Sequence, residues 1–120
     1  MRKIRFRAWD KVKGEMILWN RLLNWYNLRN VFMRPEMCGM ILMQFTGHKD
    51  KNGVGIFEKD IVKINVDNGF DYVDGIGFVD WYEKKSEYAI FSKGEPRIPL
   101  SIQGEIEVIG NIYENPELLD

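Results

Sequence analysis

Two acidic side chains, Glu58 and Asp60, are the first candidates for chemistry in this sequence. Their i, i+2 spacing places them on one face of a strand, where a pair of carboxylates can bind a cation or act as acid and base. No third ligand and no histidine lies nearby in the sequence, so a charged turn that leads into a strand is the simpler interpretation. We therefore expect neither a metal site nor a catalytic site from this pair.

The single histidine, His48, and the single cysteine, Cys38, add little chemistry. One residue of each type cannot form a zinc site of the usual kind. A nucleophilic Cys–His pair lacks an indicated orienting acid, so a buried, unreactive cysteine is the simpler expectation. Glycine-rich phosphate loops are rejected as well, because the Gly-Lys-Ser/Thr ending is absent and residues 75–80 lack the third glycine of a dinucleotide motif.

A basic stretch near the start of the chain is the best candidate for binding, with six Lys and Arg residues between positions 2 and 13. Arginines beside an aromatic ring can follow a phosphate backbone and stack a base. A contact with nucleic acid or with a protein partner would use five residues, Arg5, Arg7, Trp9, Lys49 and Lys51. The simpler interpretation is a face that is solvated or paired with acidic side chains.

The end of the chain supplies such acidic side chains, and no Lys or Arg follows Arg97 to neutralise them. If the first and last strands pair, Arg5 and Arg7 lie opposite Glu105 and Glu107 and the charges compensate each other. Alternatively, a basic edge of one subunit meets an acidic edge of the next and forms a dimer or a ring.

Composition sets the wider limits. The chain has 120 residues, which fits one domain over residues 1–120. A formal net charge of -1 gives no global attraction to nucleic acid or to anionic membranes. One cysteine excludes an internal disulfide and fits a reducing cytoplasm. No apolar run approaches the 18 residues of a membrane span, so we expect a soluble cytoplasmic protein.

Short alternating segments separated by turn residues run along most of the chain. Strands are expected at residues 3–9, 40–46, 60–66, 75–82, 88–91 and 105–109. Residues 60–66 alternate most clearly, with Val62 and Ile64 inward and Lys63 and Asn65 outward. Turns are expected at residues 50–53, where Asn-Gly tolerates a positive φ, and at residues 67–69. This pattern predicts an all-β fold, a barrel or closely packed sheets, with at most short helices.

Residues 16–33 fit two interpretations. Leu18, Leu22 and Trp25 have helical spacing, but the segment contains four asparagines and no clear N-cap precedes it. We favour strand and irregular structure, with a helix near residues 17–26 as the alternative. Residues 34–36 contain a proline and are expected to break whatever precedes them.

Four methionines follow this segment, Met33, Met37, Met40 and Met43. Methionine side chains adapt to irregular surfaces, so the cluster could form an interaction surface. A core or subunit contact is the simpler interpretation.

Four segments resemble the phage and prophage family called YopX-like, in matching order and spacing over nearly the whole chain. They are residues 4–10, 42–53, 56–62 and 107–119, and the most specific is Thr-Gly-x-Lys-Asp-Lys-Asn-Gly at residues 46–53. One departure concerns Lys59, because the family usually has Glu-Gly-Asp where this chain has Glu-Lys-Asp at residues 58–60. If that glycine serves a turn with positive φ, either Lys59 is strained or the turn is remodelled.

The resemblance implies a mainly β protein with a small SH3-like barrel element plus additional hairpins, oligomeric and carried by phages and prophages. It supplies no enzymatic activity. We therefore expect a non-enzymatic accessory protein of the host cytoplasm, without a cofactor, that assembles with itself and contacts a host or phage protein. The alternative is a small β-barrel protein that binds nucleic acid.

Overall fold

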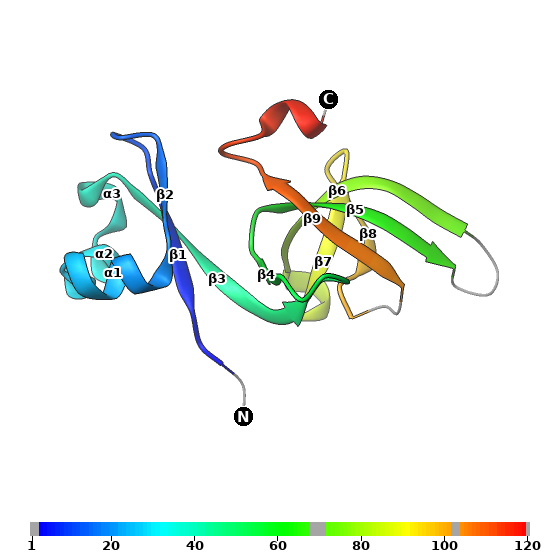
Figure 1. Cartoon of the computed structure of the whole chain (residues 1–120), viewed down its shortest axis with the longest axis horizontal. Helices are drawn as coiled ribbons and strands as arrows, with labels where there is room; N and C mark the ends of the chain where they lie inside the picture. Colours follow the sequence, from blue (N-terminus) through cyan, green and yellow to red (C-terminus); the bar gives the residue numbers. More distant parts are fainter. Residues whose placement is uncertain (1–2, 68–71, 102–103, 120) are drawn as a thin grey trace. The chain divides into compact units, whose positions relative to one another are not determined.

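The computed structural model describes residues 3–67, 72–101 and 104–119 (Figure 1). The chain forms two compact units, Met1–Phe45 and Thr46–Asp120. Strands predominate over the described residues and every helix is short, which confirms the predicted mainly β fold. The prediction that residues 1–120 form one domain is not tested by this division and stays a prediction.

The first unit combines a small antiparallel sheet with three short helices. In the sheet, β1 (Phe6–Asp10) lies between β2 (Glu15–Ile17) and the first part of β3 (Met40–Lys49). The helices between β2 and β3 are α1 (Trp19–Trp25), α2 (Leu28–Met33) and α3 (Pro35–Cys38). Asp10 shapes the turn after β1, because its Oδ1 accepts hydrogen bonds from the backbone N–H groups of Val12 and Lys13 at 2.9 and 3.1 Å.

These helices show that the preference for strand and irregular structure in residues 16–33 was wrong and that the helical alternative was nearer. Asn27 is the N-cap of α2, since its Oδ1 accepts from the backbone N–H of Asn30 at 3.3 Å. The remaining support is non-local, from a core that joins both helices to the sheet through Ala8, Ile17, Leu22, Val31 and Met40. Burial of these side chains outweighs the weak helix propensity of the exposed asparagines. Pro35 begins α3, so the expected break at residues 34–36 is a boundary between two helices.

The second unit is built on a five-stranded antiparallel sheet of order β8-β7-β6-β5-β9, which curls into a half-barrel (Figure 1). Its strands are β5 (Asp60–Asp67), β6 (Tyr72–Tyr82), β7 (Glu87–Ser92), β8 (Glu95–Pro99) and β9 (Glu105–Asn111). The hairpin strand β4 (Gly55–Phe57) pairs with β3, and two 3-10 helices are η1 (Glu83–Lys85) and η2 (Pro116–Leu119). The half-barrel corresponds to the small barrel element that the resemblance implies.

The alternation predicted for residues 60–66 is confirmed where the side chains are described. Val62 and Ile64 are buried, while Lys63 and Asn65 are exposed. The core of the unit consists of Ile56, Val62, Ile64, Val79, Ile90, Ile98, Leu100 and Ile106. The expected turn at residues 67–69 falls mostly outside the described residues.

The pairing of the first and last strands, which was one of the alternatives for the basic face, does not occur in the described part of the chain. β1 pairs with β2 and β3, and β9 pairs with β5. Glu105 and Glu107 therefore meet a lysine of their own unit, Lys51, whose Nζ lies 3.9 Å from Glu105 Oε2 and 3.2 Å from Glu107 Oε2. Strand order is a non-local property, which the alternation within each strand does not encode.

The segment that resembles the family most specifically, residues 46–53, comprises the end of β3 and the turn that leads to β4. Thr46 Oγ1 donates to the backbone carbonyl of Ile56 at 2.7 Å and accepts from the backbone N–H of His48 at 3.2 Å. Gly53 has a φ of 81°, which confirms the positive φ expected of the Asn-Gly turn.

Asp50 fixes this connection onto β9. Its side chain is 8% exposed, Oδ1 accepts from the backbone N–H groups of Asn52 and Val54, and Oδ2 accepts from that of Val108, each at 2.9 Å. Burial raises the pKa of the Asp50 carboxyl, but the three hydrogen bonds and the nearby Lys51 together lower it below its ordinary value. The segment that resembles the family most specifically therefore serves to hold the fold together.

Lys59 adopts the left-handed conformation expected of a glycine, with a φ of 71°. Its backbone is held on both sides, because its N–H donates to the carbonyl of Val79 at 2.7 Å and its carbonyl accepts from Ile112 at 3.0 Å. Its side chain forms an ion pair with Asp80. The turn is kept rather than remodelled, and Lys59 carries the strain.

No helix in the described part of the chain is long and apolar enough to cross a membrane.

Replacing Asp50 with asparagine removes the charge that accepts three part-buried hydrogen bonds, so we expect the free energy of unfolding at pH 7 to fall by about 2 kcal/mol. Because the pKa of Asp50 is lower in the folded protein than in the unfolded chain, its contribution is fully present above the unfolded value and is lost as pH falls through the folded pKa. Urea unfolding should thus show a smaller difference between wild type and D50N as pH approaches about 3.

The matched control is Asp74→Asn on the exposed part of β6, which should change stability by less than about 0.5 kcal/mol at either pH. A D50N effect that is equal at both pH values would contradict the role of the Asp50 charge.

Two substitutions of Lys59 separate backbone strain from the ion pair. Lys59→Gly and Lys59→Ala both remove the pair with Asp80, but only glycine adopts the positive φ without cost. We expect the glycine variant to be more stable than the alanine variant by about 1 kcal/mol in urea unfolding. Equal stabilities would show that the turn relaxes and stores no strain.

Candidate interaction surface

The three binding candidates of the first unit differ in exposure. Arg5 is exposed, and its guanidinium lies 5.9 Å from the centroid of the Phe45 ring. Arg7 is only 7% exposed and is paired in register with the buried Met43, and Trp9 is half-buried. Both faces of β1 are therefore covered, which leaves Arg5 as the exposed member of the predicted set in this unit.

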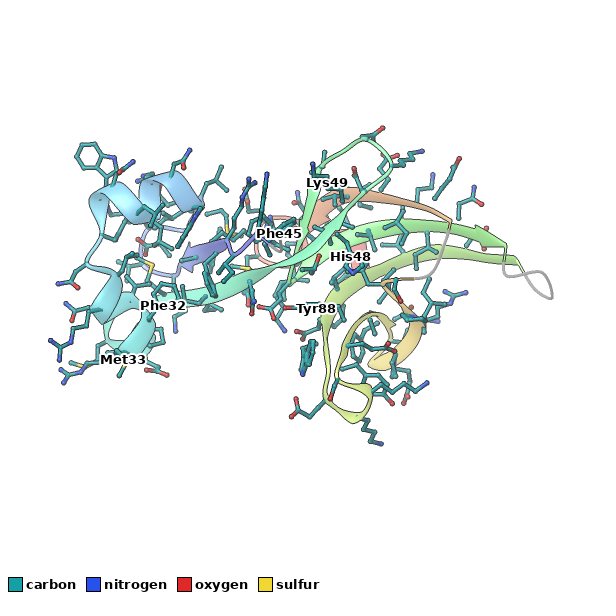
Figure 2. The ribbon with its side chains drawn as sticks, turned by 90° about the horizontal axis from the view of Figure 1, so that it is seen from below. Phe32, Met33, Phe45, His48, Lys49 and Tyr88 are labelled. Atoms are coloured by element: carbon teal, nitrogen blue, oxygen red, sulfur yellow. The ribbon has the colours of Figure 1, made fainter. Side chains whose placement is uncertain are left out.

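The two lysines of the set belong to the second unit. Lys49 is exposed at the end of β3 and directly follows the exposed His48 in the sequence (Figure 2 labels both). The pKa of Lys51 is raised, first by its side-chain hydrogen bond with Glu107 and by the charge of Glu107, and then by the charge of Glu105. The five candidates thus divide between two units, and neither unit gathers them into one basic groove in the described part.

The groups first considered for chemistry shape local structure. Asp60 is 2% exposed and its Oδ2 accepts from the backbone N–H of Phe57 at 2.8 Å, while Glu58 Oε2 accepts from the Tyr88 hydroxyl at 3.3 Å. His48 is exposed, and Cys38 is half-buried rather than buried as expected. Over residues 3–67, 72–101 and 104–119, no group of three or more His, Cys, Asp or Glu could hold a metal ion.

Exposed apolar side chains concentrate on the first unit. Eight of the twelve large apolar side chains that are exposed in the described part belong to residues 1–45. Met33 and Met37 are 74% and 78% exposed, whereas Met40 and Met43 are buried at 6% and 1%. The methionine cluster seen in the sequence therefore divides into two core residues and two surface residues.

The surface methionines lie beside two arginines. We call Arg29, Phe32, Met33, Arg34 and Met37 the α2–α3 surface (Figure 2 labels Phe32 and Met33). The Phe32 ring packs edge-on against Phe6 with centroids 4.8 Å apart, which attaches α2 to the sheet.

A depression of about 350 Å³ opens on α2, lined by Asn27, Arg29, Asn30, Met33 and Arg34. Neither arginine forms an ion pair or a side-chain hydrogen bond with another described residue. Two guanidinium groups without an anionic partner at one depression can bind a carboxylate or a phosphate in a bidentate manner.

Charge is divided unequally between the two units. Residues 1–45 contain nine basic and three acidic residues, a formal charge of +6, and residues 46–120 contain eight basic and fifteen acidic residues, a formal charge of -7. The net charge of -1 conceals this division.

The sequence interpretation offered an interaction surface only as an alternative for the four methionines, and it did not connect Met33 and Met37 with Arg29 and Arg34, because it favoured strand and irregular structure for residues 16–33. A count of charges by segment rather than over the whole chain could have revealed the basic character of this part of the sequence.

Comparison with solved structures gives a match over the full length of both chains. It is the crystal structure of protein EF1440 from Enterococcus faecalis, with a TM-score of 0.65 and 23% sequence identity, and each chain is covered to 100%. At that identity the likeness shows the fold alone. Comparison with curated proteins finds no match.

The family model described as "YopX protein" matches residues 5–120. This range contains both units apart from the first four residues. The chain therefore belongs to the YopX family.

Proposed function

We propose that this protein is a non-enzymatic accessory protein of a phage or prophage that acts in the bacterial cytoplasm through self-assembly and contacts with other proteins. The observation that carries the proposal is the α2–α3 surface. There the exposed Met33 lines a depression together with two arginines that have no acidic partner among the described residues, and Met37 is exposed on the neighbouring α3. Arginine and methionine are enriched in protein–protein interfaces. Exposed apolar groups gathered around charged groups are typical of such surfaces.

Self-assembly through the helices is favoured over self-assembly by strand addition, because both edges of the five-stranded sheet are hindered. β8 carries Pro96 and Pro99, which lack the N–H needed for pairing with another strand. At the other edge, the backbone of β9 is engaged by the turn after β3, because Lys51 N–H donates to Ile106 at 2.9 Å and Asp50 accepts from Val108. Strand addition at either edge is therefore hindered.

A nucleic-acid-binding barrel receives less support. Arg7 is buried, Lys51 is paired with Glu105 and Glu107, and the five candidate residues do not share a unit. Binding to a phosphate backbone requires exposed basic groups in a continuous path.

Light scattering after size exclusion tests the proposal. We expect the wild type to form oligomers at micromolar concentration, and Met33→Ser with Met37→Ser to raise the dissociation constant at least about tenfold, because two exposed apolar contacts are lost. Both side chains are exposed, so the melting temperature should stay within about 2 °C of the wild type.

Val54→Ser is the matched control, since Val54 is an apolar residue of the second unit with 49% exposure. It should leave the oligomer unchanged. A wild type that is monomeric at tens of micromolar would contradict the proposal, and an oligomer insensitive to the methionine substitutions would exclude the α2–α3 surface as its contact.

A further inference from the structure

The C-terminal segment has chemistry that complements the α2 depression. Glu117 and Leu119 lie on η2 and are exposed, Leu119 to 40%, and no Lys or Arg follows Arg97. Glu117 forms no ion pair or side-chain hydrogen bond with another residue in the described ranges. The segment therefore presents a carboxylate and an apolar side chain two residues apart.

The segment is held in place before it reaches η2. Asn111 is 8% exposed, its Oδ1 accepts from the backbone N–H groups of Tyr113 and Glu114 at 3.1 and 2.9 Å, and its Nδ2 donates to the Glu114 carboxylate at 3.0 Å. Asn115 Oδ1 accepts from the backbone N–H of Asn111 at 3.2 Å. A preorganised segment loses less conformational entropy on binding than a free tail does.

Gly110 allows this turn to close. A Cβ at position 110 would lie 2.5 Å from Asn115 Oδ1, so no larger residue fits without displacing Asn115. The contact between Gly110 and Asn115 orients the chain just before η2 begins at Pro116.

We propose that the α2 depression of one copy binds the Glu117–Leu119 end of another copy, with Arg29 and Arg34 holding the Glu117 carboxylate and Met33 packing on Leu119. The inference rests on the proposed self-assembly and specifies its contact. Guanidinium–carboxylate pairs can be bidentate, and methionine adapts to an aliphatic partner. The opposite formal charges of the two units, +6 and -7, favour this head-to-tail encounter over one between like units.

The contact has a definite consequence for assembly. When two copies exchange the contact reciprocally they form a closed dimer, and when each copy binds the next they form a ring or a filament. A nucleic-acid phosphate would satisfy the arginines, but it would leave Met33 without an apolar partner, so a second copy of the chain is the better match.

Charge reversal followed by mixing tests the contact. We expect Arg29→Glu with Arg34→Glu, and separately Glu117→Arg, to raise the dissociation constant of the oligomer at least about tenfold by light scattering. An equimolar mixture of the two variants should form mixed oligomers, because the reversed charges again match across copies.

Matched controls carry the same charge changes elsewhere. Lys11→Glu with Lys13→Glu alters exposed basic residues of the same unit, and Glu95→Arg alters an exposed acid on β8. Both should raise the dissociation constant far less than the reversals at the contact do, because they change the charge of a unit without changing the residues of the contact. Circular dichroism should show the same folded spectrum for all variants.

The remaining outcomes would overturn the inference, and they differ in whether the proposed function falls with it. An oligomer insensitive to the reversals excludes this contact while the proposed function stands, whereas a monomeric wild type removes both. Restoration only when all three reversals are combined in one chain contradicts a contact between copies. If Arg29→Glu with Arg34→Glu abolishes binding of a labelled single-stranded oligonucleotide and leaves the oligomer unchanged, the depression binds phosphate instead.

Discussion

Three hydrogen bonds to one buried carboxylate organise the second unit of this protein. Asp50 joins the turn after β3 to the backbone of β9, and the same turn places Lys51 against Glu105 and Glu107. Without that carboxylate, three backbone N–H groups would lose the acceptor that ties the turn to β9. The residues by which the chain most resembles its family therefore serve the fold.

The surface differs between the two units. The first unit is basic, with Met33 and two arginines around a depression. The second is acidic, and the edges of its large sheet are blocked by prolines and by the turn at Asp50. A blocked edge prevents uncontrolled strand pairing, and an adaptable helical surface permits specific association. Self-assembly through α2 and the C-terminal segment is consistent with both features.

Local features were predictable from the sequence. Alternation at Val62 and Ile64 identified a half-buried strand, and the Asn-Gly pair before Val54 identified a turn with positive φ. The replacement of a glycine by Lys59 marked a position that is either strained or remodelled, and the positive φ of Lys59 decides for strain. Each of these depends on a few consecutive residues. Non-local features were not predictable, because the helices of residues 19–38 depend on Leu22 and Val31 reaching a core shared with β1, and the partner of β9 depends on strand order. The α2–α3 surface could be identified only from the positions of those helices.

Sedimentation velocity of the full chain at rising salt concentration measures the central claim most directly. If oppositely charged units of different copies hold the assembly together, species heavier than the 14.2 kDa monomer should prevail at low salt and give way to monomer as salt screens the charges. A single 14.2 kDa species at every protein and salt concentration would contradict self-assembly. An oligomer that is indifferent to salt would contradict the role of charge.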